Sequence, residues 1–240
     1  MRFRGLTNRS VGVVAVCLLL DSSSLAEEKS KGHSVSVRVG MTQSQIQSRI
    51  DDAPEHSRVM FQTGTYRIHS LQIRHKRNLK ILADGAVSLV CDSSTANVIE
   101  VIDSEDIRIE GFRLTHREPS DLEVCVGNVI FVSGGDQTTI RNCDINGCGA
   151  IGIYAFTGRL TAVGNHIHEN SIRPIVFTGK RLKLIGNRID NNGDANHIHF
   201  RQTDDPQTVK VKERIRLAAR PDVRIQGLIM RDNVFGRNSR

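Results

Sequence analysis

The chain has 240 residues and a formal net charge of +7, and 38% of its residues are hydrophobic while 4% are aromatic. This length suits one domain with a sizeable core. The sequence shows no nucleic-acid-binding motif and no aromatic platform, so a nucleic-acid partner is not expected. A moderate positive excess is compatible with an acidic glycan, and equally with no partner.

Residues 1–26 are predicted to be a secretory signal peptide. Three arginines precede the apolar run VGVVAVCLLL, and Ser24 and Ala26 place small residues at the two positions that determine cleavage. The apolar run is too short to span a bilayer. Removal of this segment takes away the three arginines and Asp21, which lowers the net charge from +7 to +5. We expect a secreted or periplasmic monomer whose mature chain does not insert into a membrane.

A short helix is predicted after the polar and irregular residues 27–40. Thr42 and Gln45 have the spacing of a capping box, and Ile46 and Ile50 fall on one helical face. An amphipathic helix of this kind commonly covers the open end of a repeat protein, where unpaired strand edges invite aggregation. The helix is therefore expected to be a cap.

The stretch 150–193 contains one pattern twice. FTG, RL, GN and a following Ile recur, and Asn165 and Asn187 lie 22 residues apart. Short Val- and Ile-rich runs alternate with Gly-Asn steps, which is typical of a β-solenoid in which each repeat forms one coil. The two asparagines are expected to stack as a ladder at successive corners.

The repeat spacing also predicts which segments are neighbours in space. Isoleucines at one register position are expected to stack in the core, and these are Ile145, Ile167 and Ile189. Four apolar segments are expected to be adjacent parallel strands of one sheet, and these are Val129–Val132, Ile151–Ala155, Ile175–Phe177 and Ile198–Phe200.

The order of these features resembles a known superfamily. A helix, then V-x-F-x-x-G-T-Y at residues 59–66, then coils ending in GN-x-I, is similar to the pectate-lyase-like superfamily of single-stranded right-handed parallel β-helices. Residues 140–149 resemble the I-x-N-C-x-[IL]-N-G-C-G segment of bacterial right-handed β-helix repeat proteins. The resemblance implies an all-β right-handed parallel β-helix over residues 41–240 with an N-terminal capping helix. The break in the repeat predicts an inserted loop at 203–222. It assigns no activity, because the polygalacturonase and pectate lyase motifs have no match in this chain.

Four cysteines remain after the signal peptide. Cys91 and Cys143 are two of them, and Cys143 occupies an inward position and is expected to pack as an apolar residue. Cys125 and Cys148 precede strands of consecutive coils, so they are expected at neighbouring corners, where either a disulfide or a reduced pair fits. The chain has no C-x2-C pair, so the cysteines do not predict a zinc site.

Polar residues flank the inward isoleucines of three successive coils and predict an outward patch. A histidine beside a carboxylate is a candidate general base, and a neighbouring arginine can pair with a uronate carboxylate. The alternative is an ordinary solvated face. One column of the patch holds Asp144, His166 and Arg188, and the other holds Asn146, His168 and Asp190.

A second candidate is the segment NHIHFRQ. His197 and His199 flank the inward Ile198 and project from one side of the strand, with Arg201 next in line. Two such histidines can bind a metal, but no third ligand is fixed by spacing, so no metal or cofactor is predicted. Residues 203–222 break the repeat, and they either wall a groove beside this strand or form a solvated flap.

These residues favour an exported protein that binds an acidic polysaccharide, and its enzymatic form would cleave or epimerise it. In a β-elimination, an arginine would pair with the uronate carboxylate and a histidine would remove the adjacent proton. The alternatives are a non-catalytic surface or envelope protein and a periplasmic metal-handling protein similar to the copper-maturation members of the fold. The predicted catalytic residues are His166, His197, His199 and Arg201, and the predicted substrate-binding residues are Asp144, His168, Arg173, Arg188 and Asp190.

Overall fold

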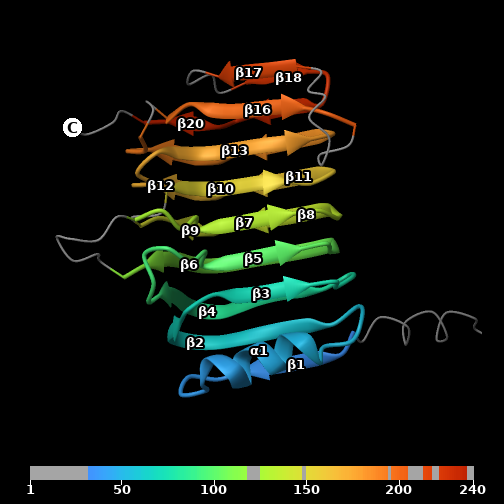
Figure 1. The fold of residues 1–240 in the computed structure, drawn as a ribbon, viewed down its shortest axis with the longest axis vertical. Coiled ribbons are helices and arrows are strands. Elements are labelled where there is room, and N and C mark those ends of the chain that lie inside the picture. The colour runs from blue at the N-terminus through green and yellow to red at the C-terminus, as the bar shows by residue number, and fades with distance from the viewer. Residues whose placement is uncertain are drawn as a thin grey trace, which may run out of the picture. The chain divides into compact units, whose positions relative to one another are not determined.

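The fold is a stack of β-coils with a helix at its N-terminal end (Figure 1). Each coil contributes strands to three outer faces, and the strands of neighbouring coils pair in parallel. This computed structural model describes residues 32–117, 125–147, 150–193, 196–204, 213–217 and 222–236.

One face is a seven-stranded sheet in the order β17-β16-β13-β10-β7-β5-β3. Its strands are β3 (Leu71–Arg74), β5 (Ile99–Ile102), β7 (Ile130–Ser133), β10 (Ile151–Phe156), β13 (Arg173–Gly179), β16 (Ile198–Gln202) and β17 (Glu213–Leu217). All neighbours pair in parallel except β16 and β17. The predicted parallel alignment of the strands now labelled β7, β10, β13 and β16 is therefore confirmed.

The other two faces belong to one thirteen-stranded sheet. Its long early strands cross from one face to the next: β2 (Arg58–Ile68), β4 (Lys80–Cys91) and β6 (Glu105–His116). In β6 the crossing occurs around Gly111, whose φ of +87° a side chain would oppose.

In later coils these two faces are built from separate strands. The second face contains β8 (Asp136–Arg141), β11 (Arg159–Val163), β14 (Arg181–Ile185), β18 (Val223–Ile225) and β19 (Leu228–Arg231). The third face contains β9 (Asp144–Ile145), β12 (His166–His168), β15 (Arg188–Asp190) and β20 (Val234–Phe235). Of these strands, β18 runs antiparallel to its neighbour β19.

The core fills the inside of the coils with aliphatic side chains from all three faces. Ile145, Ile167 and Ile189 pair in register and are each 0% exposed. The predicted core column is thus confirmed, and the alternation of strand side chains directs its neighbours outward.

A ladder of buried asparagines closes the corner between the second and third faces. The side chain of Asn165 donates to Oδ1 of Asn187 over 3.0 Å, and the side chain of Asn187 donates to Oδ1 of Asn233 over 3.0 Å. This confirms the predicted ladder and extends it by one coil. A second ladder, which was not predicted from the sequence, joins Asn170 and Asn192 over 2.8 Å at the corner between the third face and the seven-stranded sheet.

The N-terminal end is covered by α1 (Gln43–Asp51), as predicted. Thr42 and Gln45 form the capping box, and Ile46 and Ile50 are buried. The helix contacts β1, β2 and β3. No helix in the described part of the chain is long and apolar enough to cross a membrane.

Two boundaries differ from the sequence analysis. Residues 27–40 were expected to be irregular, but β1 (Ser34–Val37) lies within them and pairs in parallel with β2. The segment 203–222 was expected to be a loop, but it contains β17, which pairs antiparallel with β16. Pairing of β1 with β2, and of β17 with β16, provides hydrogen-bond partners for backbone N–H and C=O groups at the edges of the sheets.

The cysteines fall into two groups. Cys91 and Cys143 are buried free thiols, and burial raises the pKa of Cys143 to about 11. Cys143 is therefore an inert core residue, as expected. Cys125 is disulfide-bonded, and its proposed partner Cys148 lies outside the described residues.

Gly179 and Gly186 differ in how closely the neighbouring coil approaches them. A Cβ on Gly179 would lie 1.8 Å from the carbonyl oxygen of Thr157 in the preceding coil, whereas a Cβ on Gly186 would meet nothing within 4 Å. Gly186 instead has a φ of +60°. We expect Gly179→Ala to lower the free energy of unfolding by about 1–3 kcal/mol through overpacking, as urea denaturation would measure.

Substitution by asparagine separates the steric contact at Gly179 from the positive φ at Gly186. Gly186→Asn should change stability little, since asparagine tolerates the left-handed region, while Gly179→Asn should destabilise at least as much as Gly179→Ala. Equal tolerance of asparagine at Gly179 and Gly186 would contradict the close contact between coils.

Candidate functional site

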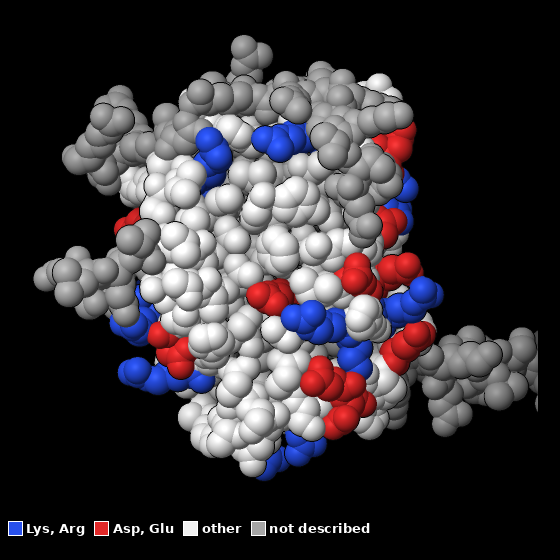
Figure 2. Space-filling view, in the orientation of Figure 1, with Lys and Arg blue, Asp and Glu red and all other residues white. Residues whose placement is uncertain are grey.

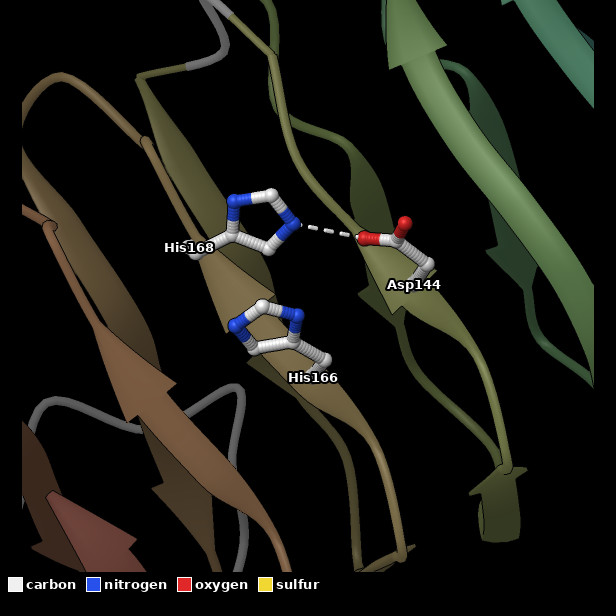
Figure 3. Close-up of side chains that lie close together, drawn as sticks. All are labelled: Asp144, His166 and His168. Carbon is white, nitrogen blue, oxygen red and sulfur yellow. Dashed lines mark hydrogen bonds and ion pairs between the residues drawn. The ribbon is translucent and has the colours of Figure 1, made fainter. Parts of the chain in front are cut away.

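The third face carries polar side chains on β9 and β12 (Figure 3) and on the neighbouring β15. The register places His166 opposite Asp144 on one side and opposite Arg188 on the other. His168 lies opposite Asp190. The repeat spacing predicted these alignments, because parallel pairing conserves register from coil to coil.

Two histidines and one aspartate form the centre of this face, and we call Asp144, His166 and His168 the His–Asp cluster. The rings of His166 and His168 are stacked, with centroids 3.9 Å apart and an interplanar angle of 19°. Nε2 of His168 lies 2.7 Å from Oδ1 of Asp144. Nε2 of His166 lies 3.1 Å from Oδ1 of Asp190 on the next coil.

These contacts change the acidity of the groups. The hydrogen bond to Asp144 raises the pKa of His168, and the same contact lowers the pKa of Asp144. Burial opposes ionisation of Asp190, but hydrogen bonds from Arg188 and His166 outweigh it and lower the pKa of this carboxyl group. The face therefore holds two stabilised carboxylates around an imidazole pair.

The patch is less exposed than the sequence analysis expected. The side chain of Asp190 is 5% exposed, whereas that of Arg188 is 66% exposed. Asn146 is also buried, with its amide nitrogen 3.1 Å from Oδ1 of Asp144. Asp190 is covered because Gly236 of the next coil packs over it, so that a Cβ at Gly236 would lie 2.6 Å from the Cβ of Asp190.

The His–Asp cluster can hold a proton or a metal ion. A histidine paired with a carboxylate can accept and release protons. Asp144, His166 and His168 also offer potential metal-ligand atoms within 4.8 Å of one another, and no other group of three His, Cys, Asp or Glu residues does so in the described segments.

The remaining predicted residues lie on a different face. Arg173 begins β13, while His199 and Arg201 belong to β16, and both strands are in the seven-stranded sheet. Ile198 is fully buried, so His197 and His199 project outward as predicted. The predicted site residues thus form two groups on separate faces of the coils. The predicted groove walled by residues 203–222 involves residues outside the described part of the chain.

The seven-stranded sheet also carries an aromatic cluster that the sequence analysis missed. The centroids of Phe131 and Tyr154 are 5.9 Å apart, and those of Tyr154 and Phe156 are 4.7 Å apart. All three rings are half-buried and alternate with fully buried residues such as Ile153. The rings are tilted against one another by 57° and 62°, so they form a cluster and not a flat platform. The alternation in IYAF was the available signal, since Ile153 points inward.

The surroundings of this aromatic cluster are largely uncharged. Figure 2 shows the face in the orientation in which β7, β10 and β13 of Figure 1 lie in front, and its centre has few charged side chains. Lys and Arg side chains lie above this area, and charged groups of both signs gather below it and along its right edge. The face therefore offers an uncharged area bordered by charged side chains.

The second face has a basic hollow of about 240 Å³. Arg159, Arg181 and Lys183 line it, together with Thr139 and Thr161. Arg159 donates to Asp136 through Nε and Nη2, and it lies opposite Arg181 in register. A glycan could bind this hollow through its basic side chains, so it is a control site for binding experiments.

The comparisons with known proteins agree with this architecture. A family model described as a right-handed β-helix region matches residues 97–239. The chain belongs to the right-handed β-helix family, and its fold is the all-β right-handed parallel β-helix that the resemblance implied. Searches of curated proteins and of solved structures returned no significant match.

Proposed function

We propose that this protein binds an acidic polysaccharide on the outer face of its seven-stranded sheet. The observation that carries the proposal is the aromatic cluster of Phe131, Tyr154 and Phe156, which lies across two neighbouring coils on a largely uncharged surface. Sugar rings have apolar faces that stack on aromatic side chains, and a polymer can follow successive coils. Right-handed β-helix proteins are often carbohydrate-related, which agrees with this assignment.

A cation in line with the aromatic cluster favours an acidic polymer. Phe156 pairs in register with Thr178, and Thr178 pairs with Arg201, whose side chain is exposed. Phe156 and Arg201 are therefore two strands apart in the sheet, with a spacing of about 4.8 Å between neighbouring strands. Tyr154 leads in the same way through Val176 to His199. Val176 and Thr178 of β13, which lie between the rings and β16, are only 7% and 5% exposed. A polymer would therefore contact the rings and Arg201 as two separate points on this face.

The proposal concerns binding and not turnover. The carboxylate–histidine pairs of the His–Asp cluster lie on the third face, away from the aromatic rings. A catalytic base must lie within hydrogen-bond reach of the proton that it removes, and of the predicted bases within strands it is His199 that lies on the sheet with the aromatic rings. The signal peptide expected at residues 1–26 would export the protein. This agrees with a partner outside the cytoplasm, where acidic glycans are abundant.

Binding should depend on the aromatic cluster and on Arg201 in different ways. We expect Tyr154→Ala to weaken binding to polygalacturonate or alginate by about five- to tenfold, because it removes a stacking surface. Arg201→Gln should weaken binding to these uronate polymers but not to a neutral polymer, and added salt should weaken the wild type similarly. Affinity electrophoresis in gels that contain each polymer would measure these effects.

The basic hollow provides the matched control. Lys183→Gln removes one positive charge, as Arg201→Gln does, but on the second face. If Lys183→Gln lowers affinity and Tyr154→Ala does not, the glycan binds at the hollow and the assignment to the aromatic face is wrong. Failure of the wild type to bind any uronate polymer would contradict the proposed function as a whole. Release of unsaturated product would show that the bound protein is also a lyase.

A further inference from the structure

We propose that Asp144, His166 and His168 bind a divalent transition-metal ion, and that Zn²⁺ suits the site. Their ligand atoms lie within 4.8 Å of one another. The two histidines flank the inward Ile167 on β12, and Asp144 lies opposite His166 on β9. Two imidazole nitrogens and one carboxylate oxygen are a known zinc ligand set, in which water takes the fourth position. This inference is independent of the glycan-binding proposal, because it concerns another face.

The second ring nitrogen of each histidine meets a carboxylate. Nε2 of His166 contacts Asp190 over 3.1 Å, and Nδ1 of His168 contacts Oε2 of Glu169 over 3.4 Å. The remaining nitrogens, Nδ1 of His166 and Nε2 of His168, lie on the side of Asp144 (Figure 3). Metal-binding histidines typically use a carboxylate in this way to hold the ring and its tautomer. Such partners on both rings are the second observation that favours a metal site over a simple hydrogen-bonded pair.

The charge around the cluster also favours a cation. Three carboxylates belong to the group, from Asp144, Glu169 and Asp190, while Arg188 contacts Asp190 and Arg113 approaches Asp144 at 4.0 Å. With neutral imidazoles the group has a net negative charge, which a divalent ion would offset. Imidazole ligands select zinc, copper or nickel over Mg²⁺ and Ca²⁺, which prefer oxygen.

Metal binding requires the three side chains to rearrange, because the stacked rings of His166 and His168 must rotate before their nitrogens converge on one ion. Ligand atoms around a tetrahedral Zn²⁺ lie about 3.4 Å apart, given metal–ligand distances of about 2.1 Å. The 2.7 Å contact between His168 and Asp144 would open by about 0.7 Å, and a pair of ligand atoms at the 4.8 Å limit would close by about 1.4 Å. The side chains of His166 and Asp144 are 34% and 40% exposed, so solvent can reach the open position.

The test is titration of the untagged, chelator-treated protein with Zn²⁺ by calorimetry, and with Co²⁺ by visible absorption. We expect one ion per chain and a cobalt spectrum of a low-coordinate site, with no binding of Mg²⁺ under the same conditions. His168→Ala and Asp144→Asn should each abolish this binding. Asp190→Asn should weaken it by about 10–100-fold, as is typical of a residue that orients a ligand.

The control is His69→Ala, since His69 forms an exposed pair with Asp92 at 3.2 Å without a second histidine. It should leave zinc affinity unchanged. Melting of each variant without metal would show that it is folded. The proposal is overturned if the wild type binds no Zn²⁺, if His168→Ala binds as the wild type does, or if His197→Ala and His199→Ala remove the binding instead.

Discussion

Ile167→Asp is expected to abolish folding, and Ile167→Ala to lower the free energy of unfolding by about 2–5 kcal/mol. Ile167 is fully buried between Ile145 and Ile189 of the neighbouring coils. Truncation to alanine loses hydrophobic burial and leaves a cavity. A carboxylate there would be desolvated inside an aliphatic column, and the buried residues that the structure describes include no Lys or Arg to pair with it.

Far-UV circular dichroism and urea denaturation would measure both effects. Thr161→Asp is the matched control, because Thr161 lies in the same coil but alternates with the buried Leu160 and Ala162 and points outward. That variant should fold and unfold nearly as the wild type does. Similar unfolding curves for Ile167→Asp and Thr161→Asp would show that the assignment of inward and outward positions is wrong.

Asn187→Ala is expected to destabilise the protein by at least about 3 kcal/mol. Oδ1 of Asn187 accepts from the backbone and side-chain nitrogens of Asn165, each over 3.0 Å, and its amide group donates to the carbonyl oxygen of Ala162 over 2.9 Å. The side chain is only 1% exposed, so water cannot replace it. Each buried polar group left without a partner costs about 1–3 kcal/mol.

Asn187→Leu separates hydrogen bonding from packing. Leucine is close to asparagine in shape, so it should fill the space while leaving the same groups of Asn165 and Ala162 unsatisfied. We expect Asn187→Leu to be as destabilised as Asn187→Ala in urea denaturation. Recovery of wild-type stability by leucine would mean that the ladder acts through volume alone.

Much of the fold was readable from local pattern. Asn165 and Asn187 are 22 residues apart, and in a stack of parallel coils residues one repeat apart lie on neighbouring strands. The same argument placed Ile167 in the core and His166 between Asp144 and Arg188. Segments without a repeat were less predictable, and β17 could not be foreseen because pairing with β16 depends on how the chain returns to the stack.

The candidate sites depended more on packing. The alternation of IYAF was present in the sequence, but the contact of Tyr154 with Phe131 arises only when two coils stack. The 5% exposure of the Asp190 side chain follows from Gly236, which lies 46 residues further along the chain in the next coil.

The amino-acid sequence determined the coil repeat, the capping helix and the direction of the strand side chains within the repeats, because these follow from interactions over one repeat or less. The tertiary structure decided which outward side chains meet, which are covered, and which ring nitrogens of His166 and His168 turn toward Asp144. The physical reason is that the strand register determines the position of a residue along the stack of coils. The rotamer and the burial of its side chain depend on residues of the neighbouring coils.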